Sequence, residues 1–208
     1  FLLKDRSLNL ADIYRQRLLE GNRISGSILG LSEVGTKNDL PTFETYIQVE
    51  SVKVKLACLI GIHRIDRVLS KKYSLEFLSH PNSRLRTKSS ELLSFYNDDE
   101  VLERARSIFL HGGYEEKKTS LRLFNQIGGW NIVGDLILAL TDKDENIQSL
   151  AWTFLETWKG KAARLFTTPA PAAMERAHST YHQLDLTKTT MSYNREALWN
   201  SLPFFLRR

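Results

Sequence analysis

The sequence contains a single cysteine, five prolines and eleven glycines in 208 residues. One cysteine excludes an internal disulfide and every zinc module that needs several cysteine ligands. The longest apolar stretch, residues 132–140, includes an acidic residue and is far too short to cross a bilayer. No basic segment followed by an apolar segment opens the chain, so we expect no membrane span and a cytoplasmic location.

The excess of charge of one sign is also small. The chain has 29 Lys and Arg against 24 Asp and Glu, a net charge of +5. An excess of that size is ordinary for a protein of this length, so it permits an acidic partner without requiring one. The first residue is Phe1 rather than methionine, and the sequence is therefore compatible with a fragment of a longer chain.

The sequence does contain an internal register of 31 residues. One column of this register holds only small residues, and the column four residues later is apolar throughout. The small column is Ser27, Cys58, Ser89, Ser120 and Ala151, and the apolar column is Leu31, Ile62, Leu93, Phe124 and Leu155. A spacing of four residues places both columns on one face of a helix. Favoured helix N-caps recur in the same register, at Ser51, Asn82, Gly113 and Asp144.

Each unit of the register therefore predicts two antiparallel helices joined by a short turn. The expected helices are 10–20, 23–34, 40–49, 52–65, 72–79, 83–96, 100–111, 114–127, 131–141 and 145–158. Five such hairpins predict an all-α solenoid, in which each hairpin buries its apolar face on its neighbours.

Three segments carry a resemblance to a known family. Residues 28–35 (ILGLSEVG), 78–86 (LSHPNSRLR) and 140–148 (LTDKDENIQ) resemble HEAT repeats, in particular the short subtype of phycobilisome-lyase-like proteins. The resemblance implies an armadillo-like, right-handed α-α superhelix with repeats at about 10–35, 40–66, 71–97, 100–128 and 131–159. The chain departs from the family pattern at Gln148, where a basic residue is usual, and in having few alanines in the second helices.

The register ends at Lys159, which divides the chain into a repeat array, 1–159, and a C-terminal segment, 160–208. The segment predicts a helix at 172–184 and another at 193–202, ended by Pro203. We interpret it as a helical cap on the last repeat, because an uncovered end would leave apolar surface in water. The alternative is a docking segment for another chain, built on Trp199 and the apolar residues 204–206.

In HEAT arrays the second helix of each repeat conventionally lines the concave surface. The resemblance thus makes the basic residues of these helices the candidate binding face: Lys53, Lys55, Arg64, Arg84, Arg86, Lys117, Lys118 and Arg122. A row of cations would attract an acidic protein segment or a phosphate backbone. The competing interpretation is structural, because the column of Lys55, Arg86 and Lys117 often supports the neighbouring turn in such repeats.

Few other residues point to chemistry. Trp130 follows two glycines and is expected to be partly exposed, so it is a possible aromatic contact for a ligand. His178 and His182 are four residues apart, a spacing that can bind a metal, but we interpret them as exposed residues of a capping helix. Cys58 belongs to the small column and is expected to be buried. No catalytic set, metal site or cofactor motif emerges.

The leading hypothesis is a non-enzymatic scaffold that binds a protein or an acidic peptide on the concave face. The alternative is a nucleic-acid-binding protein resembling the HEAT-like DNA glycosylases, for which Trp130, Tyr114 and Asp135 are the candidates. The repeat subtype alone also implies a role in bilin handling, which no individual residue supports.

Overall fold

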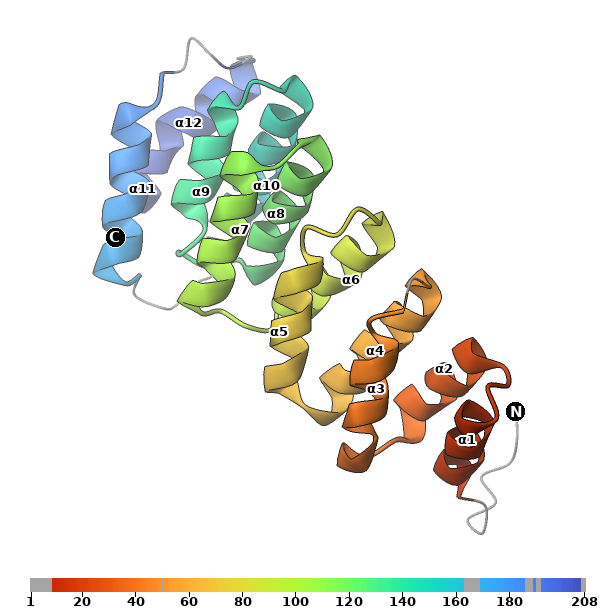
Figure 1. Ribbon diagram of the computed structural model, residues 1–208. Helices are drawn as coiled ribbons and strands as arrows, with labels where there is room; N and C mark the ends of the chain where they lie inside the picture. The colour runs from red at the N-terminus through yellow and green to blue at the C-terminus, as the bar shows by residue number, and fades with distance from the viewer. Residues whose placement is uncertain (1–8, 50, 163–168, 186–188, 190–191, 207–208) are drawn as a thin grey trace. The chain divides into compact units, whose positions relative to one another are not determined.

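A computed structural model describes residues 9–49, 51–162, 169–185, 189 and 192–206. Over these residues the fold is all-α, with twelve α-helices, two short 3₁₀ helices and no strand (Figure 1). The chain forms two compact units, one up to Leu93 and one from Ser94. No described helix is both long enough and apolar enough to span a membrane.

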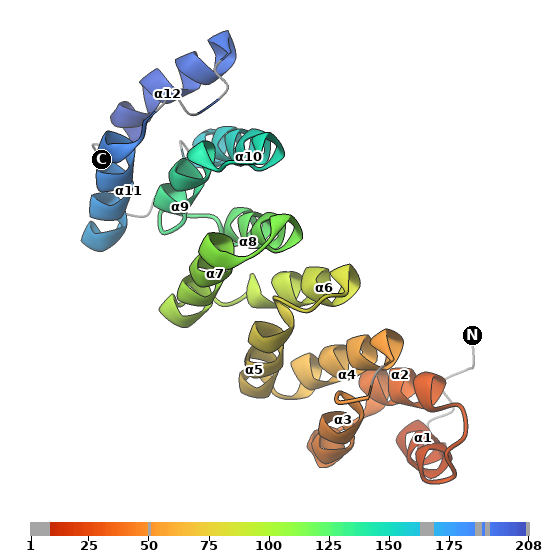
Figure 2. The same cartoon turned by 45° about the horizontal axis from the view of Figure 1, so that its top comes forward.

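The N-terminal unit consists of three helical hairpins. Its helices are α1 (Leu10–Leu19), α2 (Ile24–Val34), α3 (Leu40–Tyr46), α4 (Val52–Ile65), α5 (Arg67–Phe77) and α6 (Ser83–Leu93), with a 3₁₀ segment, η1 (Lys37–Asp39), before α3. The central helix is α4, which packs against α2, α3, α5 and α6. The second helices α2, α4 and α6 therefore form a row, which Figure 2 shows within this unit. Leu59 and Ile62 of α4 are fully buried in the core.

The C-terminal unit repeats the same pairing. Its helices are α7 (Asp99–His111), α8 (Tyr114–Ile127), α9 (Val133–Leu138), the 3₁₀ segment η2 (Ala139–Thr141), α10 (Glu145–Ala162), α11 (Pro171–Gln183) and α12 (Tyr193–Leu206). The helix α7 packs on α8, and α10 packs on both α8 and α9. Beyond the array, α11 packs on α9 and α12 packs on α10, so the last two helices cover the fifth hairpin.

The 31-residue spacing is present in the helices themselves. The second helices of four successive hairpins begin at Val52, Ser83, Tyr114 and Glu145, which lie 31 residues apart. All five members of the small column and all five of the apolar column are buried. The predicted N-cap Asp144 accepts hydrogen bonds from the amides of Asn146 and Ile147 at 2.8 and 3.4 Å. Asp144 thus caps α10, and the two buried columns show that the apolar stripe faces the core in every second helix.

Several expected boundaries differ in the structure, among them those of α5, α10 and α12. The helix α5 begins at Arg67 rather than near residue 72, because the Asp66 carboxylate caps it by accepting from the Leu69 amide at 2.9 Å. Asp66 also ends α4, so no loop separates the two helices. The helix α10 continues to Ala162, and α12 runs on through Pro203. A proline within a helix removes its own amide donor and strains one turn, and here that cost does not end the helix.

The aromatic residues of the C-terminal unit attach its last helices to the array. Trp199 of α12 is buried, stacks on Tyr181 of α11 with ring centroids 4.3 Å apart, and meets the Trp152 ring edge-on at 6.4 Å. The Trp152 indole donates to the Thr189 hydroxyl at 3.2 Å. Trp199 is therefore a packing residue. The side chains of 204–206, the rest of the expected docking segment, lie outside the described residues.

Candidate binding surface

Two cations stand without an ionic partner on the outward face of α4 and α6. Lys53 is exposed on the first turn of α4, and Arg84 is exposed on the first turn of α6, 31 residues later. Neither side chain forms an ion pair or hydrogen bond with another described residue. Both charges are therefore available to an acidic ligand.

A groove of about 350 Å³ lies between α4 and α6. Its walls are Leu56 of α4 and Ser83, Arg84, Thr87, Lys88 and Glu91 of α6. Lys88 and Glu91 form an ion pair one turn apart along α6, so Arg84 carries the uncompensated positive charge of this groove.

Apolar side chains continue this surface. Leu56 is half-buried on the α4 wall, and Ile60, one turn further along α4, is 40% exposed. Leu29 of α2, which precedes Ile60 by 31 residues, is 44% exposed. We call Lys53, Leu56, Ile60 and Arg84 the α4–α6 face. Sequence reasoning identified its two cations but missed its apolar residues, although Leu29 and Ile60 recur in the register outside the core columns.

One column of the register, Lys55, Arg86, Lys117 and Gln148, was expected to line the concave face, but its side chains contact the rest of the fold. The Arg86 side chain is only 6% exposed, and its guanidinium donates to the carbonyl oxygens of His80 and Pro81 at 2.9 and 2.8 Å. Gln148, two repeats later, donates in the same way to the Asp142 carbonyl at 2.7 Å. The long polar side chain at this position closes the turn between the two helices of its own hairpin. Arg86 was predicted to belong to the exposed binding face, and the structure instead places its side chain in this turn.

The other two members of the column are also engaged. The Lys117 ammonium pairs with the Asp142 carboxylate of the next turn and lies 5.5 Å from the centre of the Phe109 ring. The Lys55 ammonium lies 5.5 Å from the centre of the Phe77 ring, a distance at which a cation is attracted to the ring face. The structural interpretation of this column is therefore the better one.

Arg64 is a further cation with an internal role. Its guanidinium donates to the carbonyl of Ser32 at 3.0 Å and to the carbonyl of Gly35. These carbonyls belong to the C-terminal end of α2, where the helix leaves its last acceptors unpaired. Arg64 thereby ties α4 to the preceding hairpin and satisfies those acceptors.

The second helices of the C-terminal unit present a more polar surface. Lys118 lies 3.9 Å from the Glu115 carboxylate, and its ammonium lies 5.3 Å from the Tyr114 ring centre. Arg122 is exposed and forms no interaction with another described residue. The equivalent position of α10 is Thr153, so the apolar residues of the α4–α6 face have no counterpart on these two helices.

The aromatic candidate Trp130 is buried rather than partly exposed. Only 8% of it is accessible, and its ring meets the Trp158 ring edge-on at a centroid distance of 5.3 Å. The Trp158 indole in turn donates to the Gly129 carbonyl at 2.7 Å. The expectation of exposure was wrong because the two glycines turn the chain back onto α10 with positive φ values of 65° and 73°.

Asp135, the candidate acid of the glycosylase alternative, is enclosed by two arginines. Arg106 donates to both of its carboxylate oxygens at 2.9 to 3.1 Å, and Arg176 donates to one of them at 2.6 Å. The carboxylate is 3% exposed. This buried cluster joins α7, α9 and α11, and it gives Asp135 a structural role.

The remaining titratable candidates, Cys58, His178 and His182, do not come together in one site. Cys58 is fully buried, which raises the pKa of its thiol to about 12. The His178 and His182 rings stack at a centroid distance of 6.2 Å. Over the described part of the chain, no group of three His, Cys, Asp or Glu residues is placed to hold a metal ion.

Comparison with known protein families and with curated proteins finds no match to this chain. The class that the fold defines is an all-α protein built from helical hairpins with a 31-residue spacing.

Proposed function

We propose that the chain is a HEAT-like helical-repeat module, a right-handed solenoid, that binds an acidic and partly apolar segment of another protein. The proposed site is the α4–α6 face. The observation that carries it is that two unpaired cations, Lys53 and Arg84, are exposed on the same two helices that carry half-buried Leu56 and exposed Ile60.

The chemistry of this face matches an amphipathic segment. A peptide with carboxylates could pair with the two cations, while its apolar side chains cover Leu56 and Ile60. Burying apolar surface stabilises a complex by about 25 cal/mol per Å², and the charges add specificity and rate of association more than affinity. Recognition of an amphipathic helix in an apolar groove is a common mode of peptide binding.

Nucleic acid is a poorer match to the same surface. A phosphate backbone binds best to a row of unpaired cations. Here Lys55 lies over an aromatic ring, Arg86 donates to a backbone carbonyl and Lys117 forms an ion pair within the protein. Trp130 packs against Trp158, and Asp135 forms an ion pair with Arg106. Of the three residues that the glycosylase alternative names, only Tyr114 is exposed, and the candidate acid Asp135 is buried.

Selection from a displayed library of random peptides, about twelve residues long, tests the proposal. We expect the bound sequences to combine carboxylates with large apolar residues. Lys53→Glu with Arg84→Glu should weaken such a peptide by about tenfold or more, since opposite charges become like charges. The matched control is Arg122→Glu with Lys143→Glu, two exposed residues of the other unit, which should change affinity by less than about twofold.

Three results would overturn the proposal. The first is selection of peptides without acidic residues, and the second is equal affinity in both charge-reversed variants. The third is tight binding of duplex DNA with a steep loss of affinity in salt, which is the signature of phosphate contacts.

A further inference from the structure

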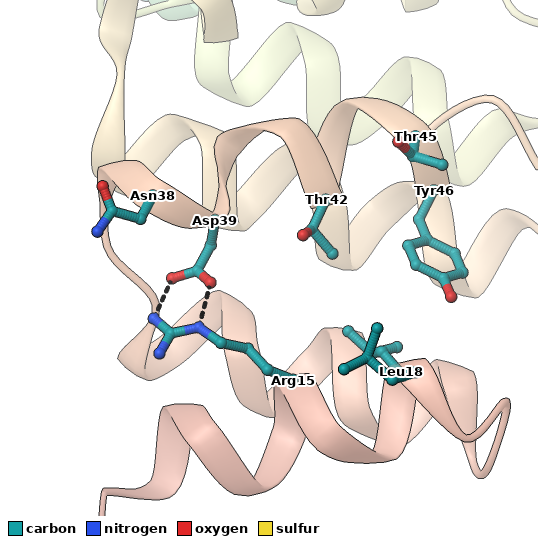
Figure 3. Close-up of a pocket in the computed structure, with 8 residues that line it drawn as sticks. Arg15, Leu18, Asn38, Asp39, Thr42, Thr45 and Tyr46 are labelled. Atoms are coloured by element: carbon teal, nitrogen blue, oxygen red, sulfur yellow. Dashed lines mark hydrogen bonds and ion pairs between the residues drawn. The ribbon is translucent and has the colours of Figure 1, made fainter.

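A second cavity, of about 580 Å³, lies between α1 and α3, the first helices of the first two hairpins. Figure 3 shows Arg15 and Leu18 of α1 facing Asp39, Thr42 and Tyr46 across the open space. Its volume lies within the range of about 300 to 1,000 Å³ that is typical of ligand sites. No residue of the α4–α6 face contributes to it.

An ion pair holds one end of this cleft. The Arg15 guanidinium donates to the two carboxylate oxygens of Asp39 at 2.7 and 3.0 Å, and the Asp39 carboxylate is 2% exposed. The Thr36 amide donates to the same carboxylate at 2.7 Å. These donors lower the pKa of Asp39, so the pair persists at neutral pH. The bidentate geometry fixes the separation of α1 from the start of α3.

The opposite side of α1 is fixed as well. The Tyr14 ring lies directly over Gly30 of α2, in the space that a Cβ would occupy. The backbone of α2 thereby allows α1 to pack closely against it. With α1 held by α2 on one side and by Asp39 on the other, the cleft stays open in the absence of a ligand. A cleft that is open beforehand costs a ligand little reorganisation energy.

The interior of the cleft combines an apolar end with neutral polar groups. Leu18 is buried and faces the half-buried Tyr46 ring, and this end suits a large apolar side chain (Figure 3). The Thr42 hydroxyl and the Asn38 amide form no hydrogen bond with another described residue. Arg15 is neutralised by its carboxylate partners, so the cleft offers no unpaired charge to a ligand.

We propose that the α1–α3 cleft binds a short, extended peptide segment of another protein, with a large apolar side chain inserted between Leu18 and Tyr46. Thr42 and Asn38 supply the donors and acceptors that the peptide's main-chain amides need. Because these groups are neutral, the segment is uncharged, which distinguishes it from the acidic partner of the α4–α6 face. The proposal does not depend on that other site.

Titration of the full chain with capped tripeptides, followed by NMR, tests this inference. The probes are acetyl-Gly-Leu-Gly-amide and acetyl-Gly-Phe-Gly-amide, with acetyl-Gly-Gly-Gly-amide as the control. We expect saturable shifts of the Leu18 methyl and Tyr46 ring signals, with millimolar affinity and about a tenfold preference over the glycine control.

Thr42→Trp should fill the cleft and abolish the shifts, whereas Thr153→Trp, on an exposed turn of α10, should leave them unchanged. If Thr42→Trp does not fold, Tyr46→Ala provides the second variant, with a loss of at least about fivefold in affinity. The inference is overturned if no saturable shift occurs, if the glycine control binds equally well, or if the shifts survive in the blocked variant.

Discussion

Replacing Arg86 tests the distinction between the structural column and the α4–α6 face. The Arg86 guanidinium donates hydrogen bonds to the carbonyls of His80 and Pro81 from a nearly buried position. A hydrogen bond from a charged donor contributes about 1.5 to 3 kcal/mol, and its loss leaves a shielded carbonyl unpaired. Arg86→Met retains the aliphatic stem but removes both donors, so we expect it to lower the free energy of unfolding by about 2 to 4 kcal/mol.

The chain itself supplies the matched replacement. Gln148 occupies the equivalent position and closes its turn with a single amide donor. Arg86→Gln should therefore retain one of the two hydrogen bonds and cost only about 1 kcal/mol. Arg84→Met, at an exposed site two residues away, should cost less than about 0.5 kcal/mol while weakening the binding of an acidic peptide.

Urea unfolding followed by circular dichroism provides the assay, with the midpoint and slope fitted for each variant. A loss below about 0.5 kcal/mol in Arg86→Met would refute the structural role. So would a loss of peptide affinity in Arg86→Gln while its stability remains unchanged, because that result would return Arg86 to the binding face.

Three further outcomes follow from the structure. Gly61→Ala should destabilise the protein by about 1 to 3 kcal/mol despite the better helix propensity of alanine, because the new Cβ would lie 2.7 Å from the buried Phe43 ring. Urea unfolding would measure the loss, and a gain in stability would contradict the prediction. Burial and nearby cations lower the pKa values of His63 and His80 below 6.5, so the unfolded chain binds more protons and stability should fall as pH drops through about 6.5; a double His→Gln variant should flatten that slope. Cys58 should resist a thiol reagent at about pH 8 until urea unfolds the chain, and rapid reaction of the native protein would disprove its burial.

The second helices were the most predictable part of the fold. Four of them begin directly after a residue type that is favoured as an N-cap, and each carries the small and apolar stripe; both patterns are visible in sequence. The start of α5 was less predictable, because Asp66 ends one helix and caps the next, and the pattern alone shows only one of these roles.

The candidate site was only partly predictable. Charge and register identify Lys53 and Arg86 equally well, yet one is exposed and the other closes a turn. That difference depends on where a carbonyl six residues upstream comes to lie, which no periodicity encodes. The α1–α3 cleft was missed for the same reason, since it depends on Arg15 reaching Asp39 across 24 residues of chain.

The central claim, that the α4–α6 face binds an acidic and apolar segment, is tested most directly by methyl NMR of the full chain. The probe is a selected acidic, apolar peptide. The account predicts saturable shifts at Leu56 and Ile60 that disappear in the Lys53→Glu, Arg84→Glu double variant. Binding that leaves the Leu56 and Ile60 signals in place, or that persists undiminished in that variant, would contradict it.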